Sequence, residues 1–458
     1  MGVRGTRQRS LGQRLLSGGS WALLAKCLTL PTGLGIALLL ARLLSPSDLG
    51  AYFLAMSLVG ITAALVQLGL GRAMVRLVAS ALATHRPGAA RQAVRIGITV
   101  TALSASAAAV LLVDGLGTWL TELLEGGERL RIALPWIALL VVAFAATELA
   151  AEILRGFQDL RAASALTEHL LQRLILLALL WTLWIGAYHP RVEQVLLLAL
   201  GAATVAAVVG LVLVRSHVAD LAHHGARLRP REVLLDGPPF LLLRFNLWLL
   251  ADAGVWVLGM LRPTQEVAVY GAANQLGLLV LAPLFVVNAV IAPVVAELYS
   301  QGRIAKLEQA VRGAAACSLL AAVALVVVLA GFGDLALGLV FGEPYAEGHV
   351  VLVVLAVGRA LAIAFGSGAI VLIMTHHQRE VVAVTAGTSV MALAGFALAA
   401  PIFGAVGIAT VIALAVAGQS ALFALLARRR LGIATWPELS AEAFARLRLE
   451  LGRARRRR

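Results

Sequence analysis

Four charged side chains stand inside long apolar stretches of this sequence: Lys26, Arg244, Asp252 and Arg359. An unpaired charge near the centre of a bilayer costs roughly 2.5–3.5 kcal/mol. Such groups must therefore face a protein interior, form ion pairs or reach the membrane surface. Because cations attract anions strongly where water is scarce, we predict that the three cations bind an anionic group. Asp252 is predicted to bind a coupling ion.

Each of these predictions has an alternative. Lys26 and Arg244 lie near the ends of their apolar stretches, from where a long side chain can extend to the aqueous surface. Asp252 lies deeper and is also a candidate partner for a cation on another helix. Arg359 lies near the middle of its stretch, shortly before the glycines at 366 and 368, where a helix can bend.

The same apolar stretches also contain a group of charged residues that can pair with one another and several neutral amide residues. Glu148, Glu152 and Arg155 share one helix face and are interpreted as a local ion pair. Four amide side chains are predicted to line an aqueous path, with hydrogen bonding between helices as the alternative: Asn246, Asn274, Gln275 and Asn288.

Motifs for metal, nucleotide or covalent chemistry are missing from the sequence. The histidine pairs at 223–224 and 376–377 have no Cys or carboxylate at ligand spacing, so no metal site is predicted. The only lysines, Lys26 and Lys306, do not follow a glycine, which excludes a Walker A loop. We predict no cofactor and no enzymatic activity.

The composition places these residues in a membrane. Apolar residues make up 60% of the chain and charged residues 14%, against roughly 45–50% and about 25% in soluble domains. Runs of about twenty apolar residues cross the hydrocarbon layer as helices. We therefore predict an all-α polytopic membrane protein with about twelve transmembrane helices, at residues 20–44, 49–71, 93–113, 132–152, 170–187, 195–214, 238–260, 269–298, 313–331, 350–375, 381–400 and 404–427.

The turn between the first two spans has a local cause. Pro46 disfavours helix at Ser45, while Ser47 or Asp48 can accept the free backbone N–H groups of the next helix. The sequence therefore predicts a membrane hairpin at 38–76.

Basic residues fall mainly on one side of these spans. With the N-terminus inside, the outer loops hold only Arg129, Arg131, Arg191 and Arg262 of the 38 Lys and Arg residues. Inner loops carry an excess of Lys and Arg, so both termini are predicted to be cytoplasmic. The basic residues that give the net charge of +14 lie in the loops beside the spans, so this charge does not indicate a nucleic-acid partner.

An internal repeat divides the chain. The turn at 46–52 recurs at 263–270, where Asp48 and Glu266 each precede a tyrosine by four residues. We predict two six-helix halves that run the same way, with the substrate path between them. The predicted boundaries are a basic tail at 1–19, a first half at 20–214, a linker at 215–236, a second half at 237–427 and a basic tail at 428–458.

The C-terminal tail is predicted to form an amphipathic helix. Thr435 and Glu438 have the spacing of a capping box, and Leu439, Ala443 and Leu447 then recur on one face. The surrounding arginines favour binding to anionic lipids of the inner leaflet. A disordered basic tail is the alternative.

Three stretches resemble one protein family. The first is LARLLSPSDLGAY, followed by a span that ends LGLGRAMVRLVA. The others are NQLGLLVLAPLFVVNAVIAPVVAELYSQGRIAKLEQAVR at 274–312 and LVFGEPYAEGHVVLVVLAVGRAL at 339–361. In both halves, therefore, the chain resembles the polysaccharide flippases of the MOP (multidrug, oligosaccharidyl-lipid, polysaccharide) exporter superfamily.

The resemblance implies a function. Such a protein flips an oligosaccharide on a polyprenyl pyrophosphate across the bacterial cytoplasmic (inner) membrane, for lipopolysaccharide O-antigen, capsule or exopolysaccharide. It works by alternating access coupled to H⁺ or Na⁺, and the polysaccharide assembly machinery is an expected partner. Lys26, Arg244 and Arg359 would neutralise the diphosphate, and Asp252 would couple transport to the ion gradient.

Three other functions remain open. A multidrug exporter of the same superfamily would use buried acids and aromatic residues for cationic drugs, whereas the spans here hold more cations than acids. A flippase for lipid-linked peptidoglycan precursors would carry two further helices. A polysaccharide polymerase or ligase would need a large outer loop, and the expected outer loops at 114–131 and 332–348 are short.

Overall fold

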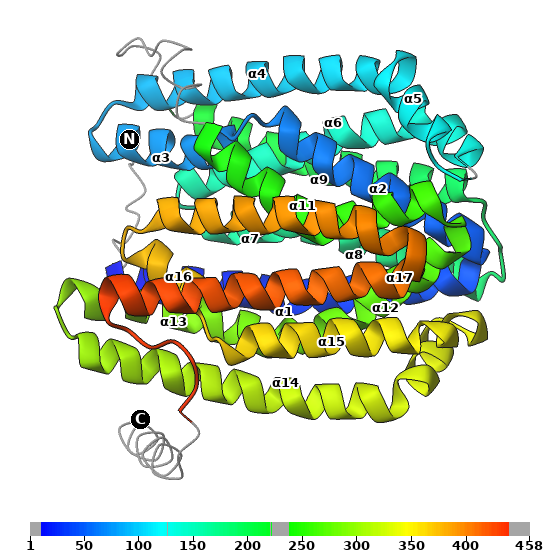
Figure 1. Cartoon of the computed structure of the whole chain (residues 1–458). Helices are drawn as coiled ribbons and strands as arrows, with labels where there is room; N and C mark the ends of the chain where they lie inside the picture. Colours follow the sequence, from blue (N-terminus) through cyan, green and yellow to red (C-terminus); the bar gives the residue numbers. More distant parts are fainter. Residues whose placement is uncertain (1–10, 126, 220, 222–237, 439–458) are drawn as a thin grey trace.

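The computed structural model describes residues 11–125, 127–219, 221 and 238–438. This part of the chain is helical and contains no β-strand, and its long helices lie side by side in one bundle (Figure 1). The helices before residue 220 are α1 (Leu11–Leu43), α2 (Pro46–Val66), α3 (Leu70–Ala83), α4 (Pro87–Asp114), α5 (Leu116–Glu122), α6 (Glu128–Gly156), α7 (Leu160–Leu166), α8 (Leu170–Ile185) and α9 (Val192–Ala219).

The remaining helices follow residue 237. They are α11 (Pro238–Leu261), α12 (Thr264–Gly277), α13 (Ala282–Ser300), α14 (Ile304–Val340), α15 (His349–Ala364), α16 (Gly368–Met374) and α17 (Gln378–Leu431). Short 3₁₀ helices connect some of these elements: η1 (Thr167–His169), η2 (Leu278–Leu281) and η3 (Glu343–Gly348).

The described helices account for twelve membrane passages. Ten helical segments are long and apolar enough to cross a membrane. One of them, α17, has 54 residues, or about 80 Å of helix, and folds back on itself (Figure 1). Counting α17 twice and adding α11 gives the twelve passages that the sequence predicts. The described chain begins and ends at the same end of the bundle (Figure 1).

The reversal inside α17 occurs at Gly404. Its backbone has φ +52° and ψ −134°, a conformation that residues with a side chain rarely adopt. A Cβ atom here would lie 2.2 Å from a carboxylate oxygen of Glu266. That carboxylate accepts a hydrogen bond from the Ala405 N–H at 2.7 Å, so it satisfies one of the free donors at the start of the returning helix.

The first turn forms where its residues predict, but its N-cap is Ser45 and not the predicted Ser47 or Asp48. Ser45 is the N-cap of α2, its hydroxyl oxygen accepts from the Asp48 N–H at 3.2 Å, and Pro46 occupies the first turn. The corresponding turn of the repeat precedes α12, and the two helices pack together. Their contact is close at Gly50, where a Cβ atom would lie 1.9 Å from the carbonyl oxygen of Thr264.

Three predicted helices are interrupted, so the expectation of continuous helices was wrong there. The helix expected at 49–71 is divided into α2 and α3 at residues 67–69. The helix expected at 350–375 stops at Ala364, and Gly366 has φ +74°. A Cβ atom on Gly366 would lie 1.9 Å from the carbonyl oxygen of Thr435, so a distant segment occupies the break. The helix expected at 269–298 contains the 3₁₀ turn η2.

Thr435 packs against the break after α15. Its side chain is fully buried, and its hydroxyl donates to the carbonyl oxygen of Phe365 at 2.8 Å. Thr435 therefore satisfies the end of α15, and the residues around it are not helical. The predicted amphipathic helix from Leu439 onward lies outside the described residues, as do residues 1–10 of the N-terminal tail and 222–237 of the linker.

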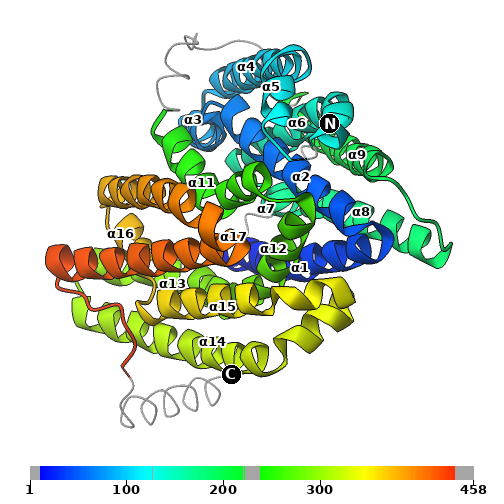
Figure 2. The same ribbon diagram turned by 45° about the vertical axis from the view of Figure 1, so that its right-hand side comes forward.

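Small residues allow close helix packing. The buried face of α9 includes Ala199, Ala203, Ala206 and Gly210, and it packs against α6. A Cβ atom on Gly210 would lie 2.9 Å from the Cβ atom of Ala150. Small residues are common where membrane helices meet because they let backbones approach. Figure 2 shows α4, α6 and α9 on one side of the molecule and α14 to α17 on the other.

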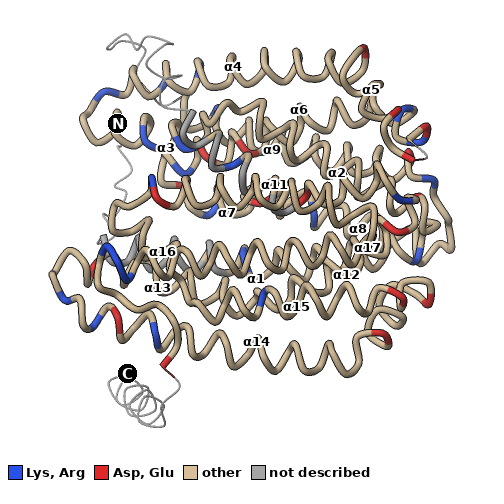
Figure 3. Tube along the Cα trace, in the orientation of Figure 1, with Lys and Arg blue, Asp and Glu red and all other residues tan. Residues whose placement is uncertain are grey.

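Charged residues gather mainly at the two ends of the bundle. Figure 3 shows long uncharged central stretches in α4, α14 and α17. This arrangement suits a protein whose middle lies in hydrocarbon. Between the ends, α6, α8 and α11 carry charges that border the cavity described below, and α1 and α15 also carry basic residues (Figure 3).

Candidate functional site

A cavity of about 700 Å³ lies among helices from both parts of the chain. This volume is in the usual range for sites that bind small molecules. Helices α2, α3, α6 and α8 form one wall, and α11 and α12 form the other. Its charged and amide side chains are Gln67, Arg72, Glu148, Glu152, Arg155, His169, Arg173, Arg244, Asp252, Asn274 and Gln275.

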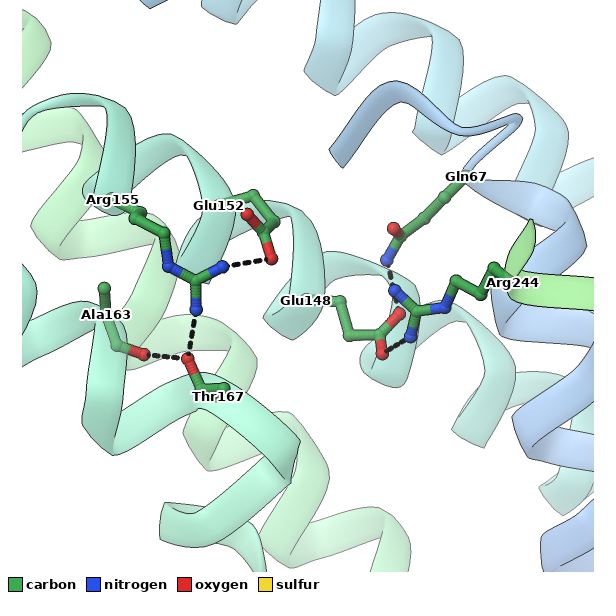
Figure 4. A network of polar contacts seen from close by, with 7 residues as sticks. All are labelled: Gln67, Glu148, Glu152, Arg155, Ala163, Thr167 and Arg244. Carbon is green, nitrogen blue, oxygen red and sulfur yellow. Dashed lines mark hydrogen bonds and ion pairs between the residues drawn. The ribbon is translucent and has the colours of Figure 1, made fainter. Parts of the chain in front are cut away.

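Glu148 is the centre of a polar network in this cavity (Figure 4). Its carboxylate accepts a hydrogen bond from Gln67 Nε2 at 2.6 Å and forms an ion pair with Arg244. His169 Nε2 lies 3.6 Å from the same carboxylate, and the His169 ring packs 4.0 Å from that of Phe144, measured between ring centroids. Three helices that are distant in sequence therefore meet at one carboxylate.

Breaks in two helices place these partners. Helix α2 ends beside Gln67, and the next residues, Leu68 and Gly69, have φ +50° and +74°. Glu168 and His169, between α7 and α8, have φ +53° and +58°. Irregular backbone at membrane depth is tolerated where it is buried or lines a cavity. Both breaks border this network, which supports a functional use of the cavity.

A second ion pair lies one turn further along α6. Arg155 Nη1 is 2.6 Å from Glu152 Oε1, and Arg155 Nη2 donates to Thr167 Oγ1 at 2.9 Å. Thr167 in turn donates to the carbonyl oxygen of Ala163 at 2.6 Å (Figure 4). The local pair predicted from sequence is present, and the structure also places it on the cavity wall.

Four of the predicted site residues line this cavity: Arg244, Asp252, Asn274 and Gln275. Arg244 forms the ion pair with Glu148, and its side chain is 44% exposed. Asp252 is partly buried, and among the described residues it forms no ion pair. The alternative that Asp252 pairs with a cation on another helix is therefore not seen in the described part of the chain.

The other predicted residues lie elsewhere. Lys26 forms an ion pair with Glu168 and stands 4.8 Å from the centroid of the Phe285 ring. These contacts adjoin a separate pocket of about 80 Å³. Asn246 belongs to α11, and its side chain lies outside the part that the structure describes.

Arg359 and Asn288 hold helices together. Arg359 is 7% exposed and donates to the backbone oxygen of Asn274 at 3.3 Å and to its side-chain oxygen. Asn288 Oδ1 accepts from Ser367 Oγ at 2.5 Å. Neither Arg359 nor Asn288 is among the described residues that line the large cavity. In this structure, therefore, Asn288 has the helix-bonding role that the sequence left as an alternative.

Sequence reasoning missed Arg173 and His169. Arg173 was counted with the basic residues of the inner segments and His169 was assigned no role, although both line the cavity. Arg173 donates to the backbone oxygen of Thr29 at 3.4 Å, and no carboxylate of the described part lies within ion-pair distance of it. His169 ends η1 with a left-handed backbone and Arg173 lies in the first turn of α8, so no helical spacing in the sequence signalled that the two residues act together.

Within the described ranges, no group of three or more His, Cys, Asp or Glu side chains is arranged to bind a metal ion. The cavity instead offers arginine guanidinium groups, which suit phosphate and carboxylate ligands.

A family model described as "polysaccharide biosynthesis protein" matches residues 15–299. No protein in a search of curated proteins matches the chain.

Solved structures of transporters share the fold. An inward-facing multidrug-resistance MATE transporter of the MOP superfamily has a TM-score of 0.68 at 17% identity, covering 88% of this chain and 94% of its own. A mutant of the Vibrio cholerae MATE transporter VcmN has a TM-score of 0.63 at 15% identity, with coverages of 92% and 98%. A MOP superfamily transporter from Pyrococcus furiosus, described as having a binding pocket of reverse polarity, has a TM-score of 0.57 at 16% identity, with coverages of 92% and 96%.

Proposed function

The chain belongs to the family of polysaccharide biosynthesis proteins, within the MOP superfamily, and from this premise we propose that it flips a lipid-linked oligosaccharide. The cargo is an oligosaccharide on a polyprenyl diphosphate, and the membrane is the bacterial cytoplasmic membrane with both termini inside. The predicted halves at 20–214 and 237–427 would move against each other, opening the cavity to one side of the membrane at a time.

The observation that carries this proposal is the arrangement of cations in the cavity. Arg173 has no carboxylate partner at ion-pair distance among the described residues, and Arg244 is half-exposed beside the Glu148 carboxylate. A guanidinium group binds phosphate through two parallel hydrogen bonds. A diphosphate that enters the cavity would therefore form hydrogen bonds with Arg173. It would also replace Glu148 as the ion-pair partner of Arg244. Lys26 and Arg359 are engaged elsewhere in this structure, so their predicted contact with cargo stays a prediction.

Coupling to an ion gradient is assigned to Asp252 within the same proposal. Its carboxylate borders the cavity without an ion-pair partner in the described part of the chain. A carboxylate in that position can bind H⁺ or Na⁺ without first breaking a salt bridge.

The test is a flipping assay in proteoliposomes with a fluorescent polyprenyl-diphosphate saccharide. We expect Arg244→Ala and Arg173→Ala each to lower the flipping rate by about 10–100-fold, because charge-assisted hydrogen bonds contribute about 1.5–3 kcal/mol. Asp252→Asn should remove the response to an imposed pH or sodium gradient. Wild-type rates in both arginine variants would refute the assigned site.

A matched control is Arg129→Ala. Arg129 is exposed and lies 3.2 Å from Asp48, away from the cavity. Like Arg244→Ala, this substitution removes one arginine from an ion pair. Because the pair lies away from the cavity, the variant should flip cargo at the wild-type rate. A loss as large as that of Arg244→Ala would show that the assay reports fold damage.

A multidrug exporter is the second candidate, because the cavity also holds acids and aromatic rings. Asp252 lies near Trp248 on α11, and Phe53 and Phe144 line the same space. A carboxylate beside aromatic rings suits a hydrophobic cation. Transport of ethidium by the same proteoliposomes, with no flipping of the diphosphate lipid, would favour this function.

A further inference from the structure

A second pocket of about 160 Å³ adjoins the large cavity. It lies among α1, α2, α6 and α8, and its apolar lining includes Ile36, Leu40 and Leu176. The smaller pocket shares six lining residues with the larger one: Phe53, Met56, Phe144, His169, Arg173 and Gln275.

Gln172 is a buried polar group that lines this pocket and lacks a partner. The residue is 3% exposed, and its Oε1 atom makes no hydrogen bond within the described part of the chain. A buried acceptor left unsatisfied costs about 1–3 kcal/mol. His169 Nδ1, from the same wall, is likewise buried without a partner among the described residues. Two unsatisfied groups that line one pocket indicate a ligand with hydrogen-bonding groups.

The other walls of the pocket are aromatic and apolar. Tyr52 is 6% exposed and Phe144 8%, and Phe53 lies between the two spaces. The Phe53 ring packs closely against Gly271, where a Cβ atom would lie 2.4 Å from the ring. Aromatic rings around a few polar groups suit a ligand that has an apolar face and a polar edge. A pyranose ring has both, in its C–H face and its hydroxyl groups.

Size and position agree with one sugar ring. At about 30 Å³ per water molecule, the pocket holds the equivalent of about five waters, which is the scale of a single ring and too small for an oligosaccharide. Arg173 lines both spaces, so a phosphate bound to it would bring the attached sugar next to the smaller pocket.

Resting on the proposed function, we propose that this pocket binds the sugar ring attached directly to the diphosphate. Gln172 Oε1 accepts a hydrogen bond from a sugar hydroxyl or acetamido N–H, and His169 Nδ1 bonds a second polar group. The ring packs against Phe53 and Phe144, while Arg173 contacts the adjoining phosphate. The pocket thus selects cargo by its first sugar, and the rest of the oligosaccharide occupies the large cavity.

The test compares two kinds of probe on the purified full-length protein. One is farnesyl diphosphate, and the other is farnesyl diphosphate carrying a single glucose, galactose, N-acetylglucosamine or N-acetylgalactosamine. We expect the wild type to bind at least one sugar-bearing probe more tightly than farnesyl diphosphate. Gln172→Leu should weaken that probe by about tenfold, the effect of losing one buried hydrogen bond, and leave farnesyl diphosphate unchanged.

Two further variants guard against damage to the fold. Thr101→Val removes another buried oxygen that has no partner in the described part, away from both pockets, and should bind all probes as the wild type does. If Gln172→Leu does not fold, Ala37→Leu fills the same pocket from α1 and should show the same selective loss. Ala37 lines the pocket and is 2% exposed.

The remaining outcomes overturn the inference or the proposed function. If no sugar-bearing probe binds more tightly than farnesyl diphosphate, or if the pocket variants weaken both kinds of probe equally, the sugar pocket is refuted. If the wild type binds neither kind of probe, the proposed flippase function itself fails.

Discussion

Arg244 and Arg359 are both arginines within apolar stretches, but the structure places them in opposite environments. Arg244 is 44% exposed at the edge of a cavity and forms an ion pair with Glu148. Arg359 is 7% exposed and is held by two oxygen atoms of Asn274. The first has a charged partner and access to ligands, and the second has neutral acceptors in a packed interior.

The comparison shows how one residue type can serve binding or folding. A cation paired with a carboxylate beside an open cavity can exchange that partner for an incoming anion. A cation whose hydrogen bonds go to an amide and a backbone oxygen links two helices, here α15 and α12. Arg359 should therefore matter most for stability and Arg244 most for transport.

The largest effect on stability is expected from Arg359→Ala. It removes a long buried side chain and leaves the side-chain oxygen of Asn274 without its arginine donor, so the free energy of unfolding should fall by about 3 kcal/mol. Thermal unfolding in detergent measures the loss. Arg359→Met, which keeps most of the volume, should lose less, and a wild-type melting temperature for Arg359→Ala would remove the structural role.

A smaller loss is expected from Glu148→Leu. Gln67 is 2% exposed and donates to this carboxylate at 2.6 Å, so the substitution leaves a buried donor unsatisfied. We expect a decrease of about 2 kcal/mol in the free energy of unfolding. Glu148→Gln retains an acceptor for Gln67 and serves as the control. Equal stability of the two variants would contradict the role of this hydrogen bond.

Arg244→Ala should cost about 1 kcal/mol or less, because the side chain is 44% exposed and ion pairs with exposed partners contribute little. Its flipping rate should nevertheless fall as predicted above. Measuring melting temperature and flipping on one preparation separates the two effects. A stability loss as large as that of Arg359→Ala would erase the difference between the two arginines.

The smallest effect is expected from Lys26→Met. The ion pair of Lys26 with Glu168 is 35% and 38% exposed at its two side chains, so its contribution should be below about 0.5 kcal/mol. Because salt screens exposed charges, the difference from the wild type should shrink between 50 mM and 500 mM NaCl. A difference that grows with salt would show that the charge pair is not its source.

Local features were predicted well because they depend on neighbouring residues. The apolar runs predict the passages, Pro46 predicts the turn before α2, and the break between residues 400 and 404 coincides with Gly404. The N-cap of α2 was misassigned, because it is Ser45 and not Ser47 or Asp48. The break after Gln67 was missed, whereas the helix predicted from residue 170 begins there as α8. Nothing in single residues such as Leu68 or Glu168 signals a left-handed backbone, which surrounding contacts must impose.

The sequence by itself determined that the chain is a bundle of membrane helices with charges it must shelter, because hydrophobic length and the cost of a buried charge are properties of each segment. Only the tertiary structure decided which charges meet the cavity. The direction of a side chain depends on how its helix is rotated and on what packs beside it. For this reason Arg244 and Asp252 line the cavity, whereas Arg359 donates hydrogen bonds to Asn274. The same packing places Arg173 and Gln172 of α8 in the wall of the smaller pocket, although the sequence of α8 shows only an apolar run like those of the other spans.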